Sequence, residues 1–93
     1  MATPYVSIGE TTIFQYLLNE AVLLNMSTQE YFALDEIGTE MWRLLMDTGD
    51  VEQIIGQLRD IYEVDEPTLR RDVESLVARL LDAGLLATQT GSE

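Results

Sequence analysis

The sequence predicts an α+β fold in which a small antiparallel sheet comes first and three helices follow, covering one face of the sheet. Segments rich in β-branched and aromatic residues are confined to the first third of the chain. At Asp35 the spacing of apolar residues changes from two to about 3.6. Turn residues then divide the rest of the chain into three segments of helix length.

The N-terminal third contains two segments with the composition of strands. Tyr5–Ile8 is short and β-branched, and residues 21–26 form an almost continuous apolar run, AVLLNM. After a polar turn, the aromatic segment Glu30–Leu34 predicts the second arm of a hairpin over residues 20–34. Residues 11–18 fit either a strand or a loop. A three-stranded sheet of this size leaves an edge strand open, and open edges pair with other chains.

Each predicted helix begins at an aspartate. Asp35, Asp50 and Asp65 stand where a side-chain oxygen can accept an orphan backbone N–H, and Asp50 with Gln53 fits a capping box. Gly84 stands where the third helix needs a left-handed C-terminal cap, and the apolar residue after it can fold back onto the last turn.

Apolar residues recur at helical spacing and predict the buried face of each helix. These positions are Ile37, Met41, Leu44 and Leu45 in the first helix, Val51, Ile54, Ile55, Leu58 and Ile61 in the second, and Leu69, Val73, Leu76, Leu80 and Ala83 in the third. Trp42 lies beside this face and is interpreted as structural. We expect one domain over residues 1–86 and a polar tail over residues 87–93.

Charge and composition restrict the class of partner. Seventeen Asp and Glu residues against five Lys and Arg give a net charge of −12, which repels phosphate backbones and anionic lipid surfaces and attracts basic partners. We therefore expect neither nucleic acid nor a membrane as ligand. No apolar run approaches the roughly 20 residues of a membrane span, and the absence of cysteine is typical of a reducing compartment, so we expect a cytoplasmic protein.

The side-chain chemistry argues against an enzyme. Without His or Cys, the chain has no Ser-His or Cys-His nucleophile and no imidazole or thiolate metal ligand. Asp47-Thr48-Gly49 matches the short signature of aspartic proteases, but it lies between two predicted helices and is interpreted as a turn. We expect no catalytic residue, no metal and no cofactor.

An ordered set of short motifs resembles the PqqD-like family. The set comprises Leu23-Leu24-Asn25, the run EYFALDEIG at 30–38, Met41-Trp42-Arg43-Leu44-Leu45, residues 51–62, Val64-Asp65, Arg71-Asp72-Val73 and Gly84-Leu85-Leu86. The resemblance covers residues 20–86 and implies a winged helix-turn-helix-like fold with a three-stranded antiparallel sheet followed by three helices. It also implies recognition of the leader segment of a ribosomally made precursor peptide, which adds a strand to the third strand of the sheet.

The resemblance implies a peptide-binding site on that strand and on the third helix. The candidate residues are Glu30, Tyr31, Phe32, Ala33, Leu34, Asp72, Val73, Leu76 and Arg79. Val73 and Leu76 also fit purely structural roles in the core, and Asp72 and Arg79 also fit a solvated flank. Only one of the pairs Tyr31/Ala33 and Phe32/Leu34 can face the helices, because side chains alternate along a strand.

The chain is most similar to the small recognition proteins of lasso-peptide clusters, which act with a separate leader peptidase and a cyclase. The expected partners are thus a precursor leader, expected to be basic because the chain is acidic, and those enzymes. A peptide chaperone of pyrroloquinoline quinone biosynthesis is the near alternative. A winged-helix DNA-binding regulator is the rival on fold grounds, but Arg70, Arg71 and Arg79 are balanced by acids on the same helix. A dimerising structural subunit would use the same open edge for a second copy of the chain.

Overall fold

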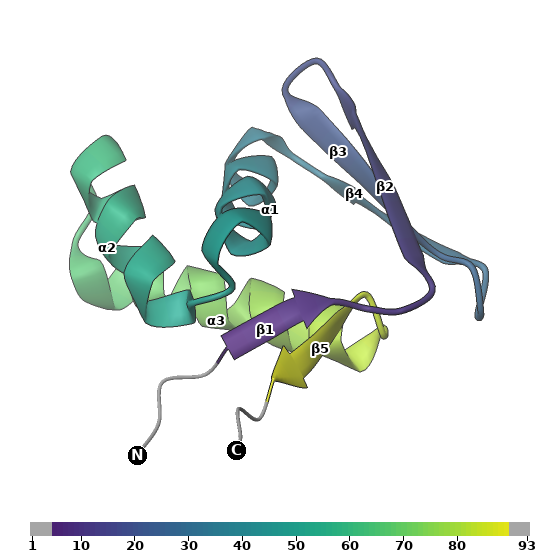
Figure 1. The fold of residues 1–93 in the computed structure, drawn as a ribbon. Helices are drawn as coiled ribbons and strands as arrows, with labels where there is room; N and C mark the ends of the chain where they lie inside the picture. The colour runs from purple at the N-terminus through teal and green to yellow at the C-terminus, as the bar shows by residue number, and fades with distance from the viewer. Residues whose placement is uncertain (1–4, 90–93) are drawn as a thin grey trace.

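The computed structural model describes residues 5–89. Its elements, in chain order, are β1 (Tyr5–Ile8), β2 (Thr12–Leu17), β3 (Glu20–Asn25), β4 (Glu30–Leu34), α1 (Glu36–Thr48), α2 (Val51–Ile61), α3 (Glu66–Asp82) and β5 (Leu86–Gln89). The sheet and the helices form separate layers, with the helices gathered on one side of the sheet (Figure 1). The predicted α+β class is confirmed, with a three-stranded antiparallel sheet preceding three helices.

The three-stranded sheet has the order β2-β3-β4. Residues 11–18, which fitted a strand or a loop, supply strand β2, paired with β3 from Thr12↔Asn25 to Leu17↔Glu20. The predicted hairpin of β3 and β4 pairs from Ala21↔Leu34 to Asn25↔Glu30. Both end strands therefore keep one free edge within the described part of the chain.

Strand β1 lies outside this sheet and pairs with β5 in a separate two-stranded ribbon. Val6 and Leu86 are each 3% exposed, so the ribbon places an apolar side chain from each strand in the core. The boundary expected at residue 86 therefore falls within a strand, because residues 87–89 pair with Ser7, Val6 and Tyr5 of β1. Residues 90–93 of the expected tail lie outside the described residues.

The helix ends follow the predicted caps. The side chains of Asp35, Asp50 and Asp65 accept hydrogen bonds from the backbone N–H groups of Gly38, Gln53 and Thr68. Only one of the two hydrogen bonds of the expected capping box forms, the one from the Gln53 N–H to Asp50. The backbone N–H of Asp50 donates to Thr48 Oγ1 instead. The third helix ends as predicted: Gly84 has φ 77°, and the N–H of Leu85 bonds to the carbonyl of Leu80 at 2.9 Å.

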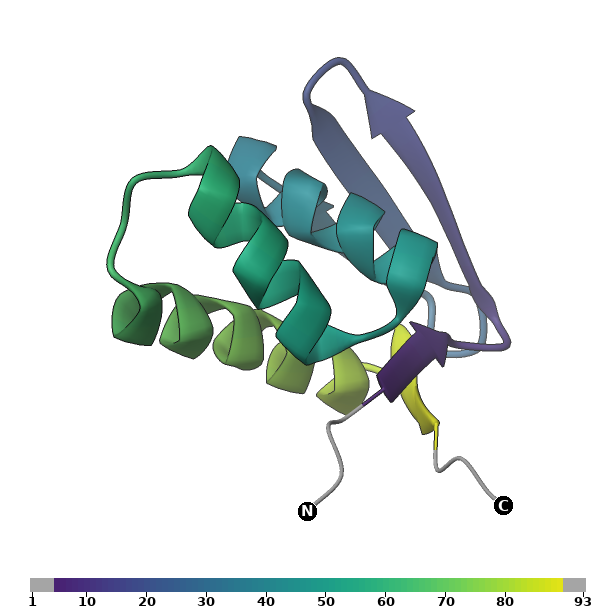
Figure 2. The ribbon, with the colours of Figure 1, turned by 60° about the vertical axis from the view of Figure 1, so that its left-hand side comes forward.

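The core lies where the three helices meet the inner face of the sheet and the β1–β5 ribbon (Figure 2). Trp42 is fully buried and stacks edge-on against Phe14 at 5.4 Å between ring centroids, which confirms its structural role. Two predicted core residues point outward instead: Ile37 is 48% exposed and Ile61 is 56% exposed, because both lie at helix ends beyond the covered part of the stripe. Over the described residues, no helix is long and apolar enough to cross a membrane.

Candidate functional site

Strand β4 exposes one edge to solvent beside helix α3. It pairs with β3 alone within residues 5–89, so its other edge presents backbone N–H and C=O groups without strand partners. Phe32 and Leu34 face the helices, while Tyr31, at 71% exposure, and Ala33 face away from them. The pair Phe32/Leu34 therefore packs toward the core, and the side chains of the pair Tyr31/Ala33 stay exposed.

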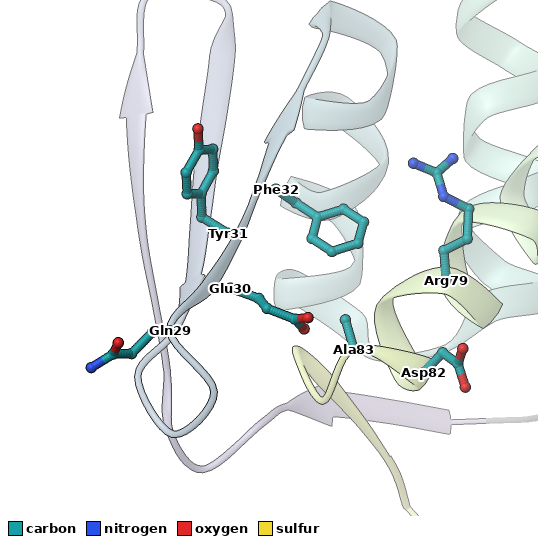
Figure 3. A pocket seen from close by; sticks show the side chains of 7 residues that line it. All are labelled: Gln29, Glu30, Tyr31, Phe32, Arg79, Asp82 and Ala83. Carbon is teal, nitrogen blue, oxygen red and sulfur yellow. The ribbon is translucent and has the colours of Figure 1, made fainter.

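A groove runs between β4 and the C-terminal part of α3 (Figure 3). It has a volume of about 570 Å³ and is lined by Gln29, Glu30, Tyr31, Phe32, Arg79, Asp82 and Ala83. The ring of Phe32 points from β4 toward α3, where the Arg79 guanidinium lies 5.9 Å from the ring centroid. A peptide along the free edge of β4 would therefore have an aromatic surface and one cation beside it.

A second hollow continues along α3 toward the start of α1. It has a volume of about 310 Å³ and is lined by Asp35, Ile37, Gly38, Met41, Asp72, Ser75, Leu76 and Arg79. Arg79 lines both hollows and thus connects them. The exposed side chain of Ile37, expected in the core, lines this surface instead.

The structure brings most of the predicted site residues together around these two hollows. Those that line them are Glu30, Tyr31, Phe32, Asp72, Leu76 and Arg79. Ala33 is exposed on the far side of β4, and Leu34 is 5% exposed beneath the strand. Val73 is fully buried in the core, the other role that its position in the sequence allowed.

Asn25 hydrogen-bonds to Ala83, one of the residues that line the groove, although Asn25 was not among the predicted site residues. Its Nδ2 donates to the carbonyl oxygen of Ala83 at 2.9 Å, which ties the β3–β4 turn to the end of α3. Its Oδ1 accepts from Thr11 Oγ1 at 2.8 Å and from the backbone N–H of Ser27 at 3.0 Å. The signal in the sequence was a single polar residue interrupting the apolar run AVLLNM. A buried polar side chain is stable there only because the fold satisfies it.

The charges around the groove are mostly acidic. Glu30 and Asp82 line the first hollow, Asp35 and Asp72 line the second, and Arg79 is the one cation that lines either. Cationic or hydrogen-bond-donating groups of a peptide would therefore be favoured along this surface.

Another arginine of α3 is engaged in a structural contact. Arg70 donates to both carboxylate oxygens of Glu52 on α2 and, at 2.8 Å, to Glu66. Hydrogen bonds from Arg70 hold the pKa of Glu52 below its usual range, and the two carboxylates raise that of Arg70. Arg70 thus joins α3 to α2.

The structure also places the side chains considered for metal binding and for protease chemistry. Within residues 5–89, no group of three acidic, His or Cys side chains is placed to hold a metal ion. The Asp47-Thr48-Gly49 triplet is the turn between α1 and α2, as interpreted from the sequence, with Gly49 at φ 72° as the C-terminal cap. The open edge of β4 beside the groove is an arrangement on which an extended peptide can pair.

Comparison with known proteins gives matches consistent with this surface. Residues 20–86 match the sequence profile of the family described as coenzyme PQQ synthesis protein D (PqqD). The solved structure of TbiB1 in complex with the TbiA(beta) leader peptide is similar at 30% identity, over 94% of this chain and 99% of that chain, with a TM-score of 0.83. A lasso peptide synthetase B1 complexed with the leader peptide shares the fold at 22% identity, over 89% and 98% of the two chains, with a TM-score of 0.81. Comparison with curated protein sequences gave no match.

Proposed function

The chain belongs to the PqqD family, and from this membership we propose that it binds the leader segment of a ribosomally synthesised precursor peptide and presents it to a processing enzyme. The observation that carries the proposal is the open edge of β4 beside the groove lined by Phe32 and Arg79. The similar structure of TbiB1, described in complex with a leader peptide, supports it. In this role the protein supplies recognition, and catalysis belongs to its partner.

The leader adds an antiparallel strand to β4. Hydrogen bonds from the peptide backbone to the free edge supply affinity that depends little on sequence, at roughly 0.5–1.5 kcal/mol net for each bond. The β4 edge is presented ready-made by its pairing with β3, so only the peptide loses backbone freedom on binding.

Selectivity comes from the alternate side chains of the added strand. Those that point toward α3 enter the two hollows, where Phe32 and Leu76 offer apolar contact and Arg79 and Asp72 offer charges of both signs. Those on the other face lie beside Tyr31. The acidic groove favours a leader with basic residues, whose encounter with a chain of net charge −12 would be accelerated by long-range attraction.

The pathway we propose is lasso-peptide biosynthesis, in which a leader peptidase and a cyclase act on the captured precursor. The structural similarity to a lasso peptide synthetase B1 complexed with the leader peptide favours it. The description of the matched family favours the second candidate, a peptide chaperone of pyrroloquinoline quinone biosynthesis. The two differ in their precursor, so titration with the leader of each kind of precursor distinguishes them.

The test is calorimetric titration of the protein with a synthetic leader from the neighbouring precursor gene. A second leader carries proline in the centre of its predicted strand, which removes a backbone N–H from the ladder. We expect saturable binding of the first leader and loss of binding with the second. If neither leader binds at concentrations well above ~100 μM, where even a site of roughly −5 kcal/mol would show, the proposal is wrong.

The groove itself is tested by a pair of arginine substitutions on α3. Arg79→Ala removes the cation beside Phe32 and should weaken leader binding by about tenfold. Arg71→Ala makes the same change in net charge on the same helix, but Arg71 lines neither hollow and the affinity should stay within about twofold. Equal affinities of the two variants would contradict a specific role for the groove.

A further inference from the structure

The face of the sheet that points away from the helices is mostly apolar and uncovered. We call it the outer face, and it consists of alternate side chains of β2, β3 and β4 together with the tip of the β2–β3 hairpin. Its apolar residues are Ile13, Leu17, Leu18, Val22, Leu24, Tyr31 and Ala33, and it also carries Gln15 and Glu20. No other described element lies on that side of the sheet (Figures 1 and 2).

The outer face has the composition of an interface rather than of a solvated sheet. An antiparallel sheet with one covered face usually alternates apolar inward and polar outward residues. Here Ile13, Leu24 and Tyr31 instead form an apolar row across the three strands, and Ile13 and Tyr31 are 52% and 71% exposed. Contiguous apolar surface of this kind marks sites of protein interaction.

The tip of the β2–β3 hairpin adds a second, independent sign of binding. Leu18 is 97% exposed and has φ 59°, in the left-handed region that glycine or asparagine occupies with little strain. A leucine there does not pack against the rest of the chain and does not favour the backbone conformation of the turn. Strained backbone that displays an unneeded apolar side chain is typical of functional sites.

The charges of this half of the molecule indicate which partner fits. Across residues 5–34 the charged side chains are Glu10, Glu20 and Glu30, and Glu20 shares the outer face with Val22 and Leu24. All five basic side chains lie on helices. A second copy would bring two chains of net charge −12 together with acids on both sides, whereas a partner with lysine or arginine around an apolar patch would be complementary.

We propose that the outer face docks the processing enzyme, through an apolar patch on that enzyme bordered by lysine or arginine. This inference rests on the proposed function. A leader strand on β4 would extend the same sheet, and its outward side chains would continue the outer face beyond Tyr31. The enzyme would thus contact this protein and its captured peptide on one continuous surface, and would bind the loaded protein more tightly than the free one.

The experiment measures two affinities for each variant of the full chain: one for the synthetic leader, and one for the purified leader peptidase encoded beside this chain's gene. Ile13→Thr and Leu18→Asn remove apolar contacts on β2 and the hairpin tip, away from the free edge of β4. Ile61→Thr is the matched control, because Ile61 is similarly exposed, at 56%, but lies on α2. Folding of each variant is checked by circular dichroism.

We expect Ile13→Thr and Leu18→Asn to weaken binding of the enzyme by about tenfold or more, and Ile61→Thr to leave it within about twofold. Leader affinity should stay within about twofold in all three. Absence of enzyme binding to the unaltered chain, or equal binding by all variants, would overturn the docking surface. So would a dimer in sedimentation that Leu18→Asn abolishes, which would identify a second copy as the occupant.

The two proposals fail in different ways. If the unaltered chain binds no leader but its binding of the enzyme is lost in the outer-face variants, the proposed function is wrong and the docking surface stands. If the leader binds and the enzyme is indifferent to the outer face, only the docking surface is wrong.

Discussion

At the scale of single residues, Asn25 connects the sheet to α3. It is 4% exposed, and its amide joins the carbonyl of Ala83 to the hydroxyl of Thr11 and the β3–β4 turn. Asn25→Ala leaves the Ala83 carbonyl and the turn without partners, and we expect a loss of about 2–3 kcal/mol in the free energy of unfolding. Urea denaturation followed by circular dichroism measures it.

The control for this prediction is Ser27→Ala in the same turn. Ser27 is exposed, and its bond to Asn25 is made by the backbone N–H, which the substitution keeps. The free energy of unfolding should change by less than about 0.5 kcal/mol. Equal stabilities of the two variants would mean that Asn25 does not anchor the turn.

For Leu18 we expect a substitution that raises the free energy of unfolding. Leu18→Asn should raise the free energy of unfolding by about 0.5–1 kcal/mol, because asparagine tolerates the left-handed conformation that strains leucine. Leu17→Asn, on the adjacent strand residue with ordinary backbone, should lower it instead. Thermal unfolding of both variants decides this, and a destabilised Leu18→Asn would remove the argument that the tip is strained.

At the scale of elements, a carboxylate-guanidinium clasp joins α2 to α3. Arg70 holds the pKa of Glu52 below its usual range by hydrogen bonding. A lowered pKa in the folded state means that the clasp contributes to stability above the ordinary carboxylate range, from about pH 5 upward. That contribution is lost as the pH falls through the lowered pKa.

The clasp therefore predicts a pH-dependent effect of Glu52→Gln. The variant should be less stable than the unaltered chain at pH 6, and the difference should shrink toward pH 3. Glu63→Gln, at an exposed acid without a described ion pair, should show no comparable dependence. Guanidinium would screen the contact, so urea unfolding at each pH is the measurement. A difference that does not vary with pH would show that ionisation of Glu52 adds nothing to stability.

Local sequence patterns predict the helices of this protein better than its short strands. The three helices begin at Asp35, Asp50 and Asp65 as predicted, because a cap and an apolar stripe are properties of a few neighbouring residues. The sequence leaves residues 11–18 open between strand and loop and places residues 87–89 in the tail, because a short strand is stabilised mainly by the partner it pairs with.

At the scale of the whole molecule, the net charge of −12 couples stability to ionic strength. Repulsion among the acids opposes the compact state, so raising the salt from about 20 mM to about 300 mM should raise the melting temperature by a few degrees. The same change should slow the association of a basic leader. Calorimetry and stopped-flow mixing measure the two effects, and a variant with several distant exposed acids changed to glutamine should show both effects weakened.

From the sequence alone we could predict the α+β class, the helix ends, the net negative charge and the aromatic strand Glu30–Leu34. Only the folded structure shows that β1 pairs with β5, that Phe32 rather than Tyr31 faces α3, and that Arg79 lines the groove while Arg70 bonds to α2. The difference comes from the distance along the chain over which each interaction acts. Caps and helical stripes act within one or two turns of the chain, whereas strand partners, burial and the engagement of a long side chain depend on residues brought together only when the core closes.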